Sequence, residues 1–218
     1  MSLTIKLVRH GESDANIGKV SSRDVGDHMI PLSDRGREQA REAGQRLGHD
    51  FVAGALVYRS PYRRTRETLE GVLEGAAVAA GDVRVYEDPR LREVEHGYDE
   101  VAAQEELRTL HGWFYYRFRG GESPADCYDR TSNFLESMMR QVERKKIDRV
   151  LIVTHGLTIR CFVMRFLHLS VEQFDSLANP INCAIVTLAD RSKLPQSDFS
   201  SGAWGCEGIT LRGNTNTP

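Results

Sequence analysis

Two stretches of the sequence share one pattern: "TIKLVRHG" at residues 4–11 and "RVLIVTHG" at residues 149–156. Each is a mostly apolar run that ends on a histidine followed by glycine, and such a run predicts a buried strand. One histidine in this context is usually structural. Two in the same context, in a chain with seven histidines, indicate that His10 and His155 share a site.

Strand-like and helix-like segments alternate along the rest of the chain. Further strands are expected at 54–59, 83–87 and 183–188, and amphipathic helices at 33–47, 60–73, 123–145 and 157–169. The pair Ser60-Pro61 is typical of an N-cap and first helical position. The alternation predicts an α/β fold, a three-layer α/β/α sandwich whose mostly parallel sheet is covered on both faces. Such folds bind ligands at the carboxyl ends of strands.

The overall composition narrows the class of protein. The 218 residues suit one domain, 1–190, followed by a tail at 191–218 that is rich in Ser, Gly, Asn and Pro and could add an edge strand. A net charge of −2 argues against nucleic-acid and membrane partners. Four cysteines without a CxxC pair, and first residues unlike a signal peptide, predict reduced thiols and a cytoplasmic location. An oligomer is compatible with the sequence.

Arginines and carboxylates complete a candidate anion site. Glycine after each histidine lets backbone amides approach a ligand and begin a helix, whose N-terminus favours anions. The stretch "SPYRRTRETL" (60–69) adds arginines, and "RLREVEHG" (90–97) places Glu93 and Glu95 on one face of an extended segment, so local geometry does not choose between them. Arginines suit a phosphate dianion, a histidine suits a nucleophile and a carboxylate suits a proton donor. We expect neither a metal nor a cofactor, since the spacing of His28, His96 and His111 fits no metal motif.

Six motifs in order then resemble the histidine phosphatase superfamily, which includes cofactor-dependent phosphoglycerate mutase and many phosphatases. They cover residues 4 to about 188 and are "LVRHGESDAN" (7–16), "PLSDRGREQA" (31–40), "SPYRRTRET" (60–68), "LREVEHG" (91–97), "GGES" (120–123) and "THG" (154–156). The resemblance implies a phosphoglycerate mutase-like fold and a small phosphorylated metabolite as the binding partner. Anchoring the third motif on Ser60 and Thr68 selects Arg64, and anchoring the fourth on Leu91 and Gly97 selects Glu93.

The resemblance also implies a role for each matching residue. His10 would be the nucleophile that becomes phosphorylated, and Glu93 would protonate the leaving oxygen and later activate water. The groups that would bind the phosphoryl oxygens are Arg9, Arg64, His155 and Gly156, with Asn16 assisting. Because His10 must be neutral to attack, we expect the two guanidinium groups to lower its pKa.

The resemblance leaves three functions to compare: a phosphatase, a phosphoglycerate mutase-type phosphotransferase and a non-catalytic phospho-ligand binding module. Around the acid, mutases resemble Glu-Arg-His-Tyr-Gly, whereas here Val94, Glu95, His96 and Gly97 follow it. Glu95 would repel a carboxylated substrate, and the segment 94–119 is short for the mutase's substrate-covering insertion. Both departures favour hydrolysis over the mutase reaction, and the presence of all the catalytic groups disfavours the binding module. We therefore expect a phosphatase acting on small phosphate monoesters.

The aromatic stretch "HGWFYYRFRGG" (111–121) has two interpretations. It could form a lid whose residues contact the leaving group, with Trp113, Tyr116 and Arg117 as candidates for substrate specificity. It could equally be a helix end that packs on the core, since aromatic side chains are usually buried for packing.

Overall fold

A computed structural model describes residues 3–97, 102–194, 196–197 and 199–212. Seven strands form one sheet in the order β3-β2-β4-β1-β5-β7-β6. In chain order the strands are β1 (Thr4–Arg9), β2 (Leu56–Arg59), β3 (Val85–Glu87), β4 (Arg149–Thr154), β5 (Ile185–Asp190), β6 (Phe199–Ser201) and β7 (Trp204–Glu207). The pairs from β3 to β1 are parallel, whereas β5, β7 and β6 continue the sheet in antiparallel fashion. The expected edge strand is thus a pair of short strands, β6 and β7.

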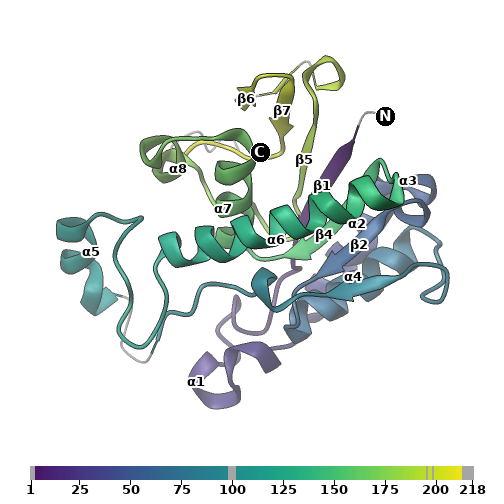
Figure 1. The fold of residues 1–218 in the computed structure, drawn as a ribbon. Helices are drawn as coiled ribbons and strands as arrows, with labels where there is room; N and C mark the ends of the chain where they lie inside the picture. Colours follow the sequence, from purple (N-terminus) through teal and green to yellow (C-terminus); the bar gives the residue numbers. More distant parts are fainter. Residues whose placement is uncertain (1–2, 98–101, 195, 198, 213–218) are drawn as a thin grey trace.

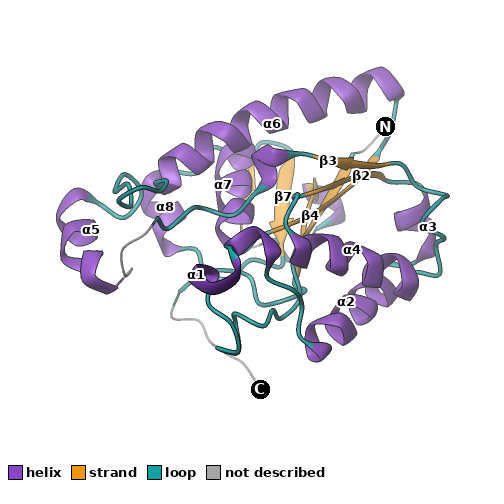
Figure 2. Ribbon diagram, turned by 90° about the horizontal axis from the view of Figure 1, so that it is seen from below, coloured by secondary structure: helices purple, strands orange, loops and turns teal. Residues whose placement is uncertain are grey.

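Helices cover both faces of this sheet (Figures 1 and 2). The eight α-helices of the described residues are α1 (Ser22–Val25), α2 (Asp34–Leu47), α3 (His49–Ala53), α4 (Arg63–Gly75), α5 (Glu105–His111), α6 (Pro124–Lys145), α7 (Gly156–Leu167) and α8 (Val171–Ser176). Helices α6 and α7 pack on one face, and α2 and α4 on the other. The predicted three-layer α/β/α architecture is confirmed.

The strand residues divide their side chains between two cores, as a period of two requires. In β4, Val150 and Ile152 pack with α6 and α7, whereas Leu151 and Val153 pack with α2 and α4. All four are fully buried, which is why this strand reads as a continuous apolar run rather than an alternating one. A third core joins the segment around 114–118 to α6, α7 and α8.

Register brings the two histidines to the same edge of the sheet. Strands β1 and β4 are neighbours, with Arg9 opposite Thr154, and the His10 amide donates to the Thr154 carbonyl at 2.9 Å. His10 and His155 therefore follow adjacent parallel strands at their carboxyl ends.

Close backbone packing explains the glycine after His10. A Cβ atom on Gly11 would lie 2.4 Å from the carbonyl oxygen of Gly36 in α2, and one on Gly36 would lie 2.0 Å from the carbonyl oxygen of Glu12. These two glycines allow α2 to pack directly against the loop that follows β1.

The predicted start of one helix is wrong. The expectation that Ser60 caps a helix over 60–73 fails because the N-cap residue is Tyr62 and α4 begins at Arg63. The Ser60 side chain instead contacts a histidine, as described below. Ser123 behaves as expected: its side chain accepts from the Asp126 amide and completes a capping box at the start of α6.

Candidate active site

Five of the ten predicted site residues line one cavity of about 690 Å³ at the carboxyl ends of β1 and β4. Its walls include Arg9, His10, Asn16, Arg64 and Glu93, which come from the ends of β1 and α4 and from the loops after β1 and β3. His155 lies beside His10, with 5.3 Å between their ring centroids.

His10 is held in one tautomer. Its Nδ1 lies 2.8 Å from the carbonyl oxygen of Gly11, and because a carbonyl only accepts, Nδ1 carries the proton and Nε2 keeps a lone pair. Burial lowers the pKa of His10 well below its ordinary value, and the charges of Arg64 and then Arg9 lower it further. The expected effect of the guanidinium groups is therefore present, although burial is the larger cause. The ring is neutral and suited to nucleophilic attack.

His155 is neutral for similar reasons. Burial lowers its pKa well below the ordinary value, with Arg64 and His10 as the next contributors. Its Nε2 lies 2.8 Å from the hydroxyl oxygen of Ser60, which also accepts from the Tyr62 amide at 3.3 Å. The Ser60 hydroxyl can donate to Nε2 or accept from it, according to the tautomer of His155. In the tautomer in which Ser60 donates, the proton of His155 is on Nδ1, a buried atom without a partner among the described residues.

The two arginines differ in what they already bind. Arg9 donates from Nη1 to the Pro180 carbonyl at 2.7 Å, and its buried Nε has no partner among the described residues. Burial lowers the pKa of Arg9, while the nearby Glu93 carboxylate raises it. Arg64 is paired with Asp27, at 3.0 Å and 3.1 Å between the guanidinium nitrogens and the two carboxylate oxygens.

Glu93 is fixed at the edge of the cavity. Its Oε1 accepts from the Val94 amide at 3.0 Å and lies 3.4 Å from the Thr158 hydroxyl oxygen. Thr158 itself donates to the Arg92 carbonyl at 2.8 Å. Glu95 lines the same cavity but is exposed. The partly buried Glu93, which lies beside Thr158 of α7, is therefore the better placed of the two carboxylates to act as an acid.

The remaining predicted phosphate ligands lie nearby. The Asn16 side chain accepts from the Ser13 amide at 3.0 Å and from Asn182 Nδ2 at 3.3 Å. Gly156 begins α7, and a Cβ atom there would lie 3.5 Å from Arg9 Nε. The N-terminus of this twelve-residue helix thus lies beside the unpaired nitrogen of Arg9, and both favour an anion.

The structure brings none of the candidate specificity residues to the cavity. The Cζ atom of Arg108 lies 3.3 Å from the centroid of the Trp113 ring. Tyr116 is buried, and its hydroxyl donates to Oε1 of Gln104. Arg117 pairs with Asp126 of α6. The alternative interpretation, in which this stretch packs on the body of the protein, agrees with these contacts.

Sequence reasoning missed three side chains that organise the site: Asp27 on Arg64, Ser60 on His155 and Thr158 beside Glu93. The sequence predicts only a helix cap and a motif anchor at Ser60. Asp27 and Thr158 had no local signal, because their partners lie 37 and 65 residues away.

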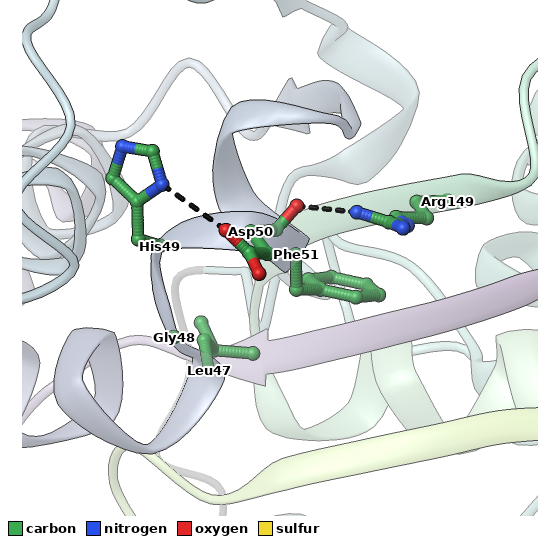
Figure 3. Close-up of a pocket in the computed structure, with 6 residues that line it drawn as sticks. All are labelled: Leu47, Gly48, His49, Asp50, Phe51 and Arg149. Carbon is green, nitrogen blue, oxygen red and sulfur yellow. Dashed lines mark hydrogen bonds and ion pairs between the residues drawn. The ribbon is translucent and has the colours of Figure 1, made fainter.

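Another depression lies at the amino end of β4, away from the site (Figure 3). Its lining includes His49, whose Nδ1 lies 3.5 Å from Oδ1 of Asp50. It also includes Arg149, which donates to the Asp50 backbone carbonyl. Both His49 and Asp50 are exposed, and nothing there resembles the buried donors around His10.

The described residues contain no group of three or more His, Cys, Asp or Glu side chains placed to hold a metal ion. Within the same residues, every helix is too short or too polar to cross a membrane.

Comparisons with known proteins agree with this geometry. Phosphoglycerate mutase-like protein AT74 of Arabidopsis thaliana is 40% identical over 201 residues, which are 83% of this chain and 63% of that protein, so the chain spans less than two thirds of that relative. Broad-range acid phosphatase DET1 of Saccharomyces cerevisiae is 26% identical over 281 residues, covering 84% of each chain. The structure of mycobacterial glucosyl-3-phosphoglycerate phosphatase with VO3 has a TM-score of 0.69 at 25% identity and covers 94% of this chain and 97% of that one. Since the family model of the histidine phosphatase superfamily (branch 1) also matches residues 5–197, the chain belongs to that superfamily.

Proposed function

We propose that this protein is a phosphatase that hydrolyses small phosphate monoesters through a covalent phosphohistidine at His10. The observation that carries the proposal is a neutral histidine with a free lone pair on Nε2, set among buried donors that lack partners. Those donors are Arg9 Nε and, in the tautomer in which Ser60 donates to Nε2, His155 Nδ1. A phosphoryl oxygen placed between them would accept a hydrogen bond from both.

The first half of the reaction transfers the phosphoryl group to the protein. Nε2 of His10 attacks phosphorus while the bond from phosphorus to the ester oxygen breaks. The leaving oxygen takes the proton of the Glu93 carboxyl group, so the alcohol departs neutral and Glu93 becomes a carboxylate. Arg9, Arg64 and His155 stabilise the charge on the equatorial oxygens.

The second half returns the protein to its starting state. Glu93, now ionised, accepts a proton from a water molecule as that water attacks phosphorus. The bond from phosphorus to Nε2 breaks, inorganic phosphate forms, and His10 regains its lone pair. Glu93 thus acts first as acid toward the leaving ester oxygen and then as base toward the attacking water. Microscopic reversibility favours these two roles for one carboxyl group, because both oxygens occupy the same side of the phosphorus.

Hydrolysis is favoured over mutase chemistry by the surroundings of Glu93. The Arg and Tyr that follow the acid in the mutase pattern are missing here, and Glu95, which lines the cavity, adds a negative charge. A carboxylated substrate that must reorient within the site would repeatedly face that charge. The match to the broad-range acid phosphatase, which covers 84% of both chains, supports the same choice.

We extend the proposal to the setting of the enzyme. All four cysteines are free and buried, which supports a reducing, cytoplasmic compartment. The substrate would be a small phosphorylated metabolite, because the cavity of about 690 Å³ is of the size that holds small ligands.

Hydrolysis of p-nitrophenyl phosphate tests this function. The wild-type protein should turn it over and be inhibited by vanadate, and His10→Ala should lose at least about a thousandfold in kcat/KM. His49→Ala, which removes an exposed histidine of α3, is the matched control and should retain activity. Near-native turnover by His10→Ala would end the proposal. No wild-type activity, together with tight binding of a phosphorylated partner, would favour the binding-module alternative.

A further inference from the structure

One carboxylate at the mouth of the cavity is bound directly to the phosphate-binding machinery. Gly26, with φ of 72°, turns the chain into a short 3₁₀ helix over Asp27–Met29. Oδ1 and Oδ2 of Asp27 accept from Nη1 and Nη2 of Arg64, and the Asp27 carbonyl accepts from Nη1 at 2.6 Å. Both Nη1 hydrogens and one Nη2 hydrogen of Arg64 are therefore used, which leaves the edge formed by Nε and Nη2 for a phosphoryl group.

A second carboxylate faces the same opening from another loop. Glu95 lines the cavity together with Asp27, and its backbone carbonyl is held by the Glu122 amide at 2.9 Å. Tyr62, which also lines the cavity, is close enough to both carboxylates to be affected by their charges. Burial raises the pKa of its hydroxyl to about 12, and the charges of Asp27 and Glu95 are the next causes of this rise. The two carboxylates thus act on one region of the mouth, although they are 68 positions apart in the sequence.

Arg64 balances the charge of Asp27 in part, whereas Glu95 has no arginine or lysine of its own among the described residues that line the cavity. Among the described residues that line the cavity, the arginines are Arg9 and Arg64, which belong to the phosphate site. Arg92 is paired with Glu122, and Arg117 with Asp126. Beyond the phosphoryl position, a leaving group therefore meets carboxylates, while a second anionic group on it would meet repulsion.

We propose that Asp27 and Glu95 are specificity-determining residues that restrict the leaving group to one that is uncharged or cationic, such as a polyol or an amine. This inference rests on the proposed function, since it describes the alcohol part of the ester that His10 would cleave. Hydroxyl and ammonium groups can donate to the two carboxylates, whereas a carboxylate or second phosphate cannot.

Three matched esters test the inference: glycerol 3-phosphate, 3-phosphoglycerate and O-phosphoethanolamine, whose leaving groups are neutral, anionic and cationic. The measurement is kcat/KM for each ester at about pH 8, above the ordinary pKa of histidine. The variants are Asp27→Asn, Glu95→Gln and the double variant. Asp24→Asn is the control, because it removes the same charge from the same segment, is exposed and does not line the cavity.

The wild-type protein should prefer glycerol 3-phosphate to 3-phosphoglycerate by at least about tenfold. Each single variant should reduce this ratio about fivefold, equivalent to about 1 kcal/mol per carboxylate, and should lower the relative rate with O-phosphoethanolamine. Asp24→Asn should leave all ratios at the wild-type values. Using ratios removes any uniform effect of releasing Arg64 from Asp27.

Two results would overturn the inference while leaving the proposed function intact. Wild-type rates that are equal for all three esters would show that the mouth does not select by charge. A uniform change for all esters in Asp27→Asn would show that Asp27 only competes with phosphate for Arg64. Absence of turnover with every ester would refute the proposed function as well.

Discussion

The two histidines of the site should make the protein less stable as the pH falls. His10 and His155 are almost completely buried, with 4% and 0% of their surface exposed, and both have a pKa well below the ordinary value, mainly through burial. In the unfolded chain they take up protons near the ordinary pKa of about 6.5. The unfolded state therefore binds more protons than the folded state below that pH, and the free energy of unfolding must fall with decreasing pH.

The size of the effect follows from proton linkage. While the folded ring stays neutral, one such histidine lowers the free energy of unfolding by about 1.2 kcal/mol between about pH 6 and pH 5. The two rings together account for about 2.4 kcal/mol over that interval, a substantial part of the stability of a typical domain. Carboxylates that bind protons on unfolding act in the same direction, so the contribution of each histidine must be obtained by difference.

Urea unfolding of the wild type and of His10→Gln at several pH values measures this difference. The free energy of unfolding of the variant should fall by about 1.2 kcal/mol less than that of the wild type between about pH 6 and pH 5. His49→Gln, at an exposed position, is the control and should follow the wild type. The comparison concerns the change with pH and does not depend on the absolute stability of either variant.

Parallel pH dependence of His10→Gln and wild type would refute the reasoning. It would mean that His10 takes up its proton equally in the folded and unfolded states. A histidine that protonates so readily in the folded protein could not remain the neutral nucleophile that the proposed mechanism needs.

Substitutions at Ser60, Thr158 and Trp113 provide three further tests. Ser60→Ala should lower kcat/KM about tenfold, because His155 loses the hydrogen bond that selects its tautomer; unchanged kinetics would remove that role. Thr158→Val should lower kcat about fivefold with little change in KM, since Glu93 loses a neighbouring hydroxyl, and Thr158→Ser should restore it; a Ser variant as slow as the Val variant would contradict this. Trp113→Ala should keep the relative kcat/KM values of aromatic and sugar esters within about twofold, and a selective loss with aromatic esters would revive the lid.

Sequence periodicity predicted the layers of the fold because the buried strands and helices carry it directly. The apolar run of β4 and the His-Gly pairs after β1 and β4 are visible in the local sequence. The rule that ligands bind at the carboxyl ends of strands then predicts that the two histidines lie at the site. The antiparallel direction of β5 was not predictable from its own residues. Direction depends on the connection through α8 and the following loop, which has no distinctive pattern.

The supporting contacts of the site could not be predicted, because they join residues that are distant in the sequence. Ser60 followed by Pro61 is an ordinary helix start, yet its hydroxyl is committed to His155, 95 positions away. Asp27 pairs with Arg64 from a short 3₁₀ turn that follows Gly26, a glycine with a positive φ. Both arrangements depend on tertiary packing rather than on local propensity.

The central claim is that His10 carries the phosphoryl group during turnover. Rapid quenching under alkaline conditions, followed by mass spectrometry of the peptide that contains His10, measures this directly. The proposal predicts one added phosphoryl group on His10 in the wild type, a larger fraction in a Glu93→Gln variant in which hydrolysis is slowed, and none in His10→Ala. Continued hydrolysis with no phosphorylated His10 in either the wild type or Glu93→Gln would contradict it.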